Sequence, residues 1–206
     1  MFEGSHGSGK TTQAKLLKDY LCKQRIPTIY THEPYSEEIG KLIDRYSIVD
    51  NVSPYLLLYL YAADRLLHVR YIKEKLDNSN VVITDRYLLS SCVDHQIQGI
   101  QLELIEQINF FCIEPDVTLI FDVSFFERSR RLKEAKRLRN TLFFKEKNMK
   151  LEEKLYRNLF KKYKCEWKNL FMIDGERDIN EMHKEIIALI ERLGCFRTNY
   201  SDLLHK

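Results

Sequence analysis

Residues 4 to 12 read Gly4-Ser5-His6-Gly7-Ser8-Gly9-Lys10-Thr11-Thr12, a run of the form G-x-x-x-x-G-K-[ST]. The glycines of such a run let backbone N–H groups curl around a phosphate, while Lys10 neutralises the outer phosphate oxygens and the Thr11 hydroxyl ligates Mg²⁺. A helix expected from about residue 9 to residue 23 points the positive end of its dipole at the same anion. Chance occurrence in a turn is the alternative, which the following helix and the additional Gly7 disfavour. The stretch therefore predicts a P-loop that binds a nucleoside triphosphate.

Strand-like and helix-like patterns alternate along the rest of the chain. Apolar, β-branched runs predict strands over residues 27–31, 81–84, 117–121 and 170–173. Helices are expected over about 53–76 and 178–194, each with a capping signal at its first residue. This rhythm predicts an α/β fold, a P-loop NTPase three-layer sandwich with a central parallel sheet and helices on both faces. Ligands of such sheets bind outside the carboxyl ends of the strands.

The strand before the P-loop is the exception to this pattern. Only Met1-Phe2-Glu3 precede Gly4, whereas a central strand usually has about 5–6 residues. Either the true start of the chain lies upstream, or the sheet tolerates a short strand.

Length and composition predict one globular domain over residues 1–206. Of the 206 residues, 44% are hydrophobic and 31% are charged, and the net charge is +3. Five scattered cysteines without a C-x-x-C pair predict free, mostly buried thiols in a reducing compartment. No apolar run reaches the roughly 18 residues of a membrane span, and no leader precedes the loop. We therefore expect a cytoplasmic protein that binds no membrane.

Asp85-Arg86-Tyr87 follows the strand expected over residues 81–84. A carboxylate at a strand end beside a P-loop is where the second Mg²⁺-organising group belongs, and Arg86 would then lie beside the phosphates. An aspartate cap with an arginine partner is the alternative, and the presence of the P-loop favours the functional interpretation. Asp85 and Thr11 are therefore expected to be metal ligands, and Arg86 is expected to act with Lys10 in catalysis.

Seven of the twelve residues from Arg128 to Arg139 are basic. A solvated helix face is the ordinary explanation and holds for most of them, but a helix this basic repels itself unless an anion visits it. Arginines that close over a γ-phosphate stabilise the transition state of phosphoryl transfer. We therefore expect a short basic lid at about residues 128–145. A nucleic-acid patch is the rival explanation, which the scarce interleaved aromatic residues and the lack of a nucleic-acid-binding motif disfavour.

Tyr61 and Arg65 lie four residues apart, so they share one face of the helix expected over 53–76. An aromatic ring and an arginine on one face can stack on a nucleotide base and hydrogen-bond its edge. An amphipathic core helix with a surface ion pair is the alternative, and this segment alone favours it.

Taken together, these segments resemble the thymidylate kinase (dTMP kinase) family of P-loop nucleoside monophosphate kinases. They occur in family order and at family-like spacing, and as a set they are specific, although the P-loop is the only specific one by itself. The match runs from about Phe2 to Val123, and more weakly to Asp174. The matching segments are Phe2-Glu3-Gly4, Gly7 to Gln13, Glu33-Pro34, Ile39-Gly40-Lys41, Ala62-Ala63-Asp64-Arg65 with His68, Asp85-Arg86-Tyr87 with Ser90-Ser91, and Pro115-Asp116 leading into Phe121-Asp122-Val123.

The resemblance implies a role for each matched residue. On the donor side, it implies that Arg131 packs on the ATP adenine and that a lid arginine serves catalysis. On the acceptor side, it implies that Tyr61 stacks on thymine, Arg65 contacts the base, Ser91 reads the base edge, Arg86 binds the acceptor phosphate and Glu33 lines the site. The family is usually homodimeric, so a homodimer is implied as well.

Two residues of the acceptor site depart from the family pattern. The family usually has an acidic residue at His6, where it holds the sugar 3′-hydroxyl, and a tyrosine at Asp94, where the ring disfavours a 2′-hydroxyl. Both differences concern the sugar and neither concerns the phosphates.

The activity implied is the phosphorylation of dTMP to dTDP by in-line transfer of the γ-phosphoryl group of ATP, assisted by Mg²⁺. A kinase for dUMP, UMP, dCMP or thymidine is the nearest alternative, because His6 and Asp94 differ from the family pattern. A non-catalytic protein in which ATP switches a partner-binding surface is a second alternative, and a nucleic-acid-binding protein is a third.

Overall fold

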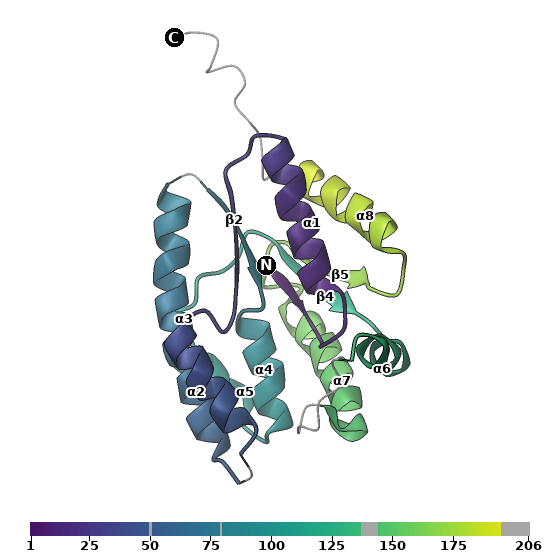
Figure 1. Cartoon of the computed structure of the whole chain (residues 1–206). Helices are drawn as coiled ribbons and strands as arrows, with labels where there is room; N and C mark the ends of the chain where they lie inside the picture. Colours follow the sequence, from purple (N-terminus) through teal and green to yellow (C-terminus); the bar gives the residue numbers. More distant parts are fainter. Residues whose placement is uncertain (50, 79, 137–143, 195–206) are drawn as a thin grey trace.

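The computed structural model describes residues 1–49, 51–78, 80–136 and 144–194. Five strands form one central sheet, and helices cover both of its faces (Figure 1). The strands are β1 (Phe2–Gly4), β2 (Thr28–His32), β3 (Val81–Asp85), β4 (Thr118–Asp122) and β5 (Leu170–Asp174). The helices are α1 (Lys10–Lys23), α2 (Glu37–Ser47), α3 (Pro54–Asp77), α4 (Leu88–Ile97), α5 (Leu102–Ile108), α6 (Phe125–Glu134), α7 (Glu146–Tyr163) and α8 (Ile179–Arg192).

All neighbouring strands pair in parallel, in the order β2-β3-β1-β4-β5. The four strands expected after the P-loop are present, each within one residue of its expected bounds, and the predicted α/β fold is confirmed. The capping signal at Asp178 is confirmed too, because its carboxylate accepts hydrogen bonds from the first backbone N–H groups of α8. After β1 the chain forms β2 and β3 on one side of β1 in the sheet, and it later forms β4 and β5 on the other side. This switch of direction opens a crevice at the carboxyl ends of the central strands.

Strand β1 has only three residues, yet it is the central strand of the sheet. Phe2 pairs with Asp85 of β3 on one side and with Leu119 of β4 on the other, and all three residues of β1 are buried. The sheet therefore holds a central strand shorter than the usual length of about 5–6 residues, because two neighbouring strands and two layers of helices enclose it. A cavity of about 690 Å³ lies at the amino-terminal edge of these strands, at the opposite edge from the P-loop, and its lining includes Val82 and Val117.

A hydrophobic layer covers each face of the sheet. Helices α1 and α8 pack on one face, where Leu17 and Ile186 meet the side chains of β1 and β4. Helices α3, α4, α5 and α7 pack on the other face. In β4, Leu119 and Phe121 point to the first layer while Ile120 points to the second, as the alternation of a strand requires. Burial on both faces explains why the strands read as continuous apolar runs.

Four cysteines lie in the described ranges, Cys22, Cys92, Cys112 and Cys165, and all four are free thiols, as their spacing predicts. The expectation that they are mostly buried is wrong, because Cys22 and Cys165 are exposed and only Cys92 is fully buried. No helix within the described ranges has both the length and the apolar character needed to cross a bilayer.

Candidate active site

The P-loop connects β1 to α1 and turns at glycines that no other residue could replace without strain. Gly4 has a φ of +139°, and a Cβ there would lie 2.8 Å from the carbonyl oxygen of Phe121. Gly9 caps α1 in the left-handed region with a φ of +92°. The buried ammonium of Lys10 donates to the Ser5 carbonyl oxygen across the loop, at 3.1 Å. The loop thus presents the start of α1 and one recessed cation to the same space, as predicted.

Thr11 and Asp85, the two expected metal ligands, are in direct contact. The Thr11 hydroxyl donates to Asp85 Oδ2, and the Tyr30 hydroxyl donates to the same oxygen at 3.2 Å. The other oxygen, Asp85 Oδ1, is buried and has no hydrogen-bond partner within the described residues. A buried carboxylate oxygen without a donor is costly. A hydroxyl and a carboxylate suit Mg²⁺, which takes few protein oxygens and completes its shell with water and phosphate. The residues therefore fit the predicted ion.

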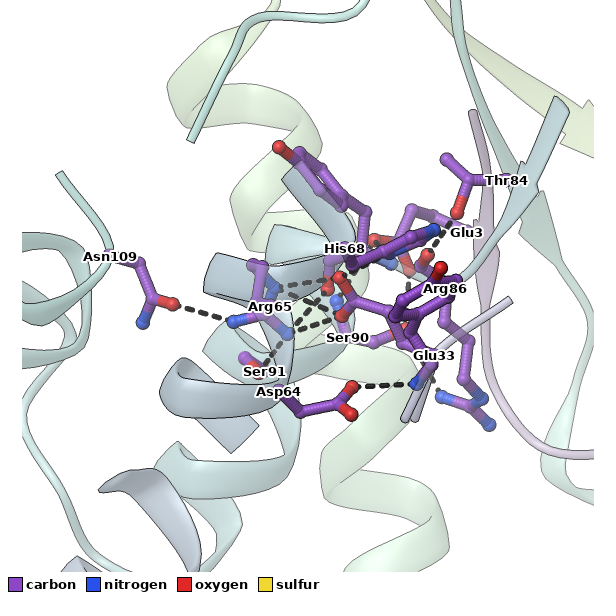
Figure 2. Close-up of polar contacts among 12 residues, drawn as sticks. Glu3, Glu33, Asp64, Arg65, His68, Thr84, Arg86, Ser90, Ser91 and Asn109 are labelled. Carbon is purple, nitrogen blue, oxygen red and sulfur yellow. Dashed lines mark hydrogen bonds and ion pairs between the residues drawn. The ribbon is translucent and has the colours of Figure 1, made fainter. Parts of the chain in front are cut away.

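Arg86 directly follows β3 and has a strained backbone. Its φ is +72°, a left-handed conformation that costs a non-glycine residue roughly 1–2 kcal/mol. The chain holds it there from both sides, because the Arg86 amide donates to Phe2 O at 2.9 Å and its guanidinium donates to Ser90 Oγ at 3.1 Å. Ser90 in turn donates to the buried carboxylate of Glu3, whose pKa burial raises (Figure 2). The guanidinium is thus fixed beside the P-loop, where Arg86 was expected.

Arg65 and Glu33 form a buried ion pair (Figure 2). Their side chains are 1% and 3% exposed, and Arg65 donates to Glu33 at 2.6 Å from Nη2 and at 2.9 Å from Nε. His68 contacts the same carboxylate, with 3.0 Å between Nδ1 and Oε1. Burial would raise the pKa of Glu33, but Arg65 and His68 hold it below its ordinary value. Glu33 is therefore ionised and balances the charge of Arg65.

Two more residues take up most of the remaining donors of Arg65. Asn109 Oδ1 accepts from Nη1 at 2.6 Å, and Ser91 Oγ accepts from Nη2 at 2.7 Å. The Asn109 amide group also donates to Ile105 O at 2.8 Å, which orients its oxygen toward Arg65. A guanidinium carries five N–H groups, and these contacts leave one N–H of Nη1 without a partner in the described chain.

Tyr61 and Asp94, expected at the base and the sugar, come from facing helices. The Tyr61 ring lies edge-on to His95 of α4, with 5.6 Å between the ring centroids. Asp94 Oδ1 is buried and has no partner among the described residues. Burial raises the pKa of Asp94 to about 7. Near pH 7 its neutral and ionised forms therefore coexist, so Asp94 can donate or accept a hydrogen bond.

His95 is fully buried, and within the described chain neither ring nitrogen has a hydrogen-bond partner. Burial, with a smaller effect of Arg65, lowers the pKa of His95 to about 3. In the unfolded chain a histidine titrates near 6.5, so on acidification the unfolded state binds this proton first. The stability that neutral His95 contributes is therefore complete above about pH 6.5 and is lost as the pH falls toward 3.

We expect the variant His95→Leu to lose less stability on acidification than the parent protein. At about 1.4 kcal/mol per pH unit, the difference between pH 7 and pH 5 should be about 2 kcal/mol. Urea unfolding at the two pH values measures it, with exposed His32→Gln as the matched control. An equal loss of stability in the parent and in His95→Leu would contradict the assignment of a buried neutral imidazole.

The first arginines of the basic run are paired with carboxylates of the same chain. Arg130 contacts Glu127 at 2.6 Å and Glu134 at 2.7 Å, and Arg131 contacts Glu127 at 2.6 Å. Arg128 is fully buried and also has a glutamate partner. The expectation that this segment repels itself unless an anion visits it is therefore wrong for these three arginines. Residues 137–143 of the expected lid lie outside the described residues.

The guanidinium of Arg131 lies beside the P-loop. A Cβ built on Gly9 would come within 4.0 Å of Arg131 Nη1. Its side chain is a quarter exposed, with 25% of its surface accessible. Arg131 is therefore placed to contact a nucleotide bound to the loop.

Four residues with structural roles in the site had no role in the sequence-based prediction: Glu3, His68, Asn109 and Glu152. Glu3 anchors the start of α4, because its carboxylate accepts from the backbone N–H groups of Tyr87 and Ser90. Glu152 of α7 contacts the P-loop at the backbone N–H of His6, 3.3 Å away. Glu3 was detectable, since a carboxylate in a buried strand needs donors. Glu152 is one of many charged residues in its helix, and no pattern distinguishes it.

Known proteins resemble this chain over nearly its whole length. The sequence model of the family described as thymidylate kinase matches residues 2–186. A probable thymidylate kinase of Methanococcus aeolicus is 40% identical over 189 residues, which cover 91% of this chain and 92% of the relative. Probable thymidylate kinase 1 of Saccharolobus solfataricus is 35% identical, with 92% and 95% covered. A probable thymidylate kinase of Pyrococcus abyssi is also 35% identical, with 93% and 94% covered. The chain belongs to the thymidylate kinase family.

Proposed function

We propose that this protein transfers the γ-phosphoryl group of ATP to dTMP, giving ADP and dTDP. The observation that carries the proposal is the convergence of Lys10, Arg86 and the Thr11–Asp85 pair at the carboxyl ends of the central strands. Burial and the nearby Arg86 together lower the pKa of Lys10 to about 8. Two neighbouring cations, of which Lys10 is buried and Arg86 is partly exposed, are costly unless an anion joins them. A P-loop beside these cations is suited to such an anion.

Transfer proceeds by in-line attack of an acceptor phosphate oxygen on the γ-phosphorus. The protein gives little covalent help; it aligns two anions and offsets their repulsion. Two unit charges about 4 Å apart repel by about 4 kcal/mol at an effective dielectric constant of 20. Lys10 offsets this repulsion on the donor side and Arg86 on the acceptor side. Arg131, in the proposed lid over about residues 128–145, adds a third cation and packs on the ATP adenine.

Residues 4–12 would bind the phosphates of ATP, and Thr11 and Asp85 would hold the Mg²⁺. When bound, the ion neutralises charge that develops on the transferring phosphoryl group. The buried, unpartnered Asp85 Oδ1 supports this placement.

The acceptor nucleotide would lie between α3 and α4. Its phosphate would contact Arg86, and its base would lie against the N–H of Arg65 Nη1 that has no partner among the described residues. The residues proposed to bind dTMP are His6, Glu33, Tyr61, Arg65, Arg86, Ser91 and Asp94.

Initial rates with ATP, Mg²⁺ and each of dTMP, dUMP, UMP, dCMP and thymidine test the proposal. We expect the highest kcat/KM with dTMP. A clear preference for another acceptor would replace dTMP as the substrate, a result that His6 and Asp94 would explain. ATP binding without transfer to any of the five acceptors would instead favour a nucleotide-dependent switch.

We infer that the protein works in a reducing compartment, the cytoplasm. The four free thiols of the described chain support this inference.

Exposed apolar side chains form a stripe along α2 and α3. Five of them recur along α3 at spacings of three, four and seven residues, which places them on one helical face. The members are Leu42, Tyr55, Leu56, Tyr59, Leu66 and Leu67, each between 39% and 58% exposed. Contiguous exposed apolar surface marks an interaction site. We propose that the same stripe of a second copy covers it in a two-fold homodimer.

The variant Leu66→Lys is expected to weaken this dimer at least about tenfold, because a lysine ammonium would lie in an apolar interface. Sedimentation equilibrium across a range of protein concentrations measures the dissociation constant. Phe126→Lys, which changes an exposed apolar residue of α6, is the matched control and should leave the dimer unchanged. A parent protein that stays monomeric, or a Leu66→Lys variant that dimerises normally, would refute this interface.

A further inference from the structure

Glu152 joins three elements of the protein around one buried carboxylate. The residue lies on α7 and is 2% exposed. Its Oε1 accepts from the backbone N–H of His6 in the P-loop at 3.3 Å, and its Oε2 accepts from Arg128 of α6 at 2.6 Å. Arg128 is itself fully buried and donates to Met149 O at 2.5 Å. The negative charge of Glu152 is thus balanced by α6 and directed at the loop.

Helix α6 packs directly on the same part of the loop. A Cβ built on Gly7 would come within 3.0 Å of Leu132 Cγ and within 3.4 Å of the Arg128 carbonyl oxygen. The backbone next to His6 therefore has no room to move toward α6. With Glu152 on one side and α6 on the other, the position of His6 is set by the fold rather than by the loop alone.

The imidazole of His6 lies against the same carboxylate. Its Nδ1 is 3.6 Å from Glu152 Oε1, and its ring is tilted against Phe144 with 5.3 Å between centroids. About a third of the side chain, 36%, remains exposed. Burial and the nearby Arg86 lower the pKa of His6 below its ordinary value, so the ring is neutral at pH 7. A neutral imidazole has one N–H and one bare nitrogen, and its surroundings decide whether Nδ1 or Nε2 carries the proton.

A carboxylate next to Nδ1 attracts a proton on that nitrogen and repels a lone pair there. We propose that Glu152 is a positioning residue that holds the His6 proton on Nδ1, so that the bare Nε2 accepts a hydrogen bond from the acceptor nucleotide. The inference rests on the function proposed above. The phosphate of dTMP is largely ionised at pH 7 and offers acceptors, whereas the sugar hydroxyl is a donor that matches a bare nitrogen. In dTMP the 3′-hydroxyl is the only hydroxyl of the sugar, so it is the group that His6 would recognise.

This arrangement also suits the charge of the site. A carboxylate at position 6 would accept the same hydrogen bond but would add a negative charge close to Glu152 and to two nucleotide phosphates. A neutral imidazole nitrogen accepts the hydroxyl proton without that repulsion.

The tautomer of His6 is measurable without substrate. In ¹⁵N-labelled protein, imidazole ¹⁵N shifts distinguish a protonated from a bare nitrogen, and comparison with His6→Gln assigns the signals of His6. We expect Nδ1–H as the major form in the parent protein at pH 7.5. In Glu152→Gln, where the carboxylate charge is gone, Nδ1–H should become the minor form. Nε2–H as the major form in the parent, or an unchanged tautomer in Glu152→Gln, would overturn the proposal.

Kinetics with two acceptors provide the second measurement. Glu152→Gln is expected to raise KM for dTMP about tenfold, the value of one hydrogen bond, with a smaller change in kcat. With 3′-deoxy-dTMP, which lacks the hydroxyl, parent and variant should have KM values within about twofold. An equal increase for both acceptors would show a general structural effect and overturn the proposal.

The two measurements separate this proposal from the function on which it rests. A protein that fails to phosphorylate dTMP but shows the expected tautomer would refute the function and retain the role of Glu152 toward His6. Should the unpaired Arg128 prevent Glu152→Gln from folding, the double variant Glu152→Gln/Arg128→Met removes that charge. In this double variant Nδ1–H of His6 is expected to be the minor form, and Nδ1–H as the major form would overturn the proposal.

Discussion

Replacing Lys10 by alanine is expected to lower kcat by at least about 10³-fold while the protein stays folded. Removing one positioned donor from a transition state costs about 10²–10³ in kcat, and a cation on a transferring phosphoryl group is worth about 10³–10⁵. Lys10 is the cation that the P-loop itself supplies, and its ammonium contacts the loop at Ser5 O. Its burial already lowers its pKa to about 8, so the charged ammonium costs stability in the folded state. Removing it should therefore not lower the free energy of unfolding by more than about 1 kcal/mol.

ADP release in a coupled assay and thermal unfolding measure the two halves of this expectation. Lys23→Ala is the matched control, because Lys23 is exposed in the last turn of the same helix and far from the loop. Near-normal turnover in Lys10→Ala would remove the P-loop from the mechanism. A large fall in melting temperature would show instead that Lys10 stabilises the fold, and loss of activity would then say nothing about phosphate binding.

The parts of the site that the sequence predicted lie within single segments. A P-loop places Gly9, Lys10 and Thr11 by its own turn, and Asp85 is positioned because the carboxyl ends of parallel strands meet at one edge. Strands buried on both faces are recognisable as apolar runs, so the sheet was predictable as well. The length of β1 was the exception, since it depends on how neighbouring elements enclose the strand and not on the strand alone.

The contacts that were not predicted join residues far apart in the chain. Glu152 reaches His6 over 146 positions, and no spacing rule connects two such residues. The buried state of Arg128 follows from the same contact, so this arginine could not be separated from its exposed neighbours by composition. The neutralisation of Arg130 and Arg131 is different. Glu127 lies three and four positions before them, and this helical spacing alone predicts the ion pairs.

The second large effect is expected at the buried pair of Glu33 and Arg65. Glu33→Gln has nearly the shape of the parent side chain but leaves the guanidinium of Arg65, 1% exposed, without its counter-charge. Breaking a buried pair by removing one partner costs about 3–5 kcal/mol. For a chain of 206 residues this corresponds to a fall in melting temperature of roughly 6–20 °C. The matched control is Glu37→Gln, which removes an exposed i,i+4 partner of Lys41 and should cost less than about 1 kcal/mol.

A double variant separates the charge from the packing. Arg65→Met in the Glu33→Gln background removes the unpaired cation, and replacing both members of a buried pair is often close to neutral. We therefore expect the double variant to regain more than half of the stability that Glu33→Gln loses, although Asn109 and Ser91 each lose a donor. If the stability lost through Glu33→Gln and the stability lost through Arg65→Met add in the double variant, the guanidinium acts through its hydrogen bonds and not through its charge.

The stabilising effect of Glu33 should also depend on pH. Because the pKa of Glu33 is held low, its contribution to stability is present above about pH 4.5 and is lost on acidification. The parent and Glu33→Gln should therefore converge in stability as the pH falls below that value, whereas a constant difference down to acidic pH would contradict the ion pair.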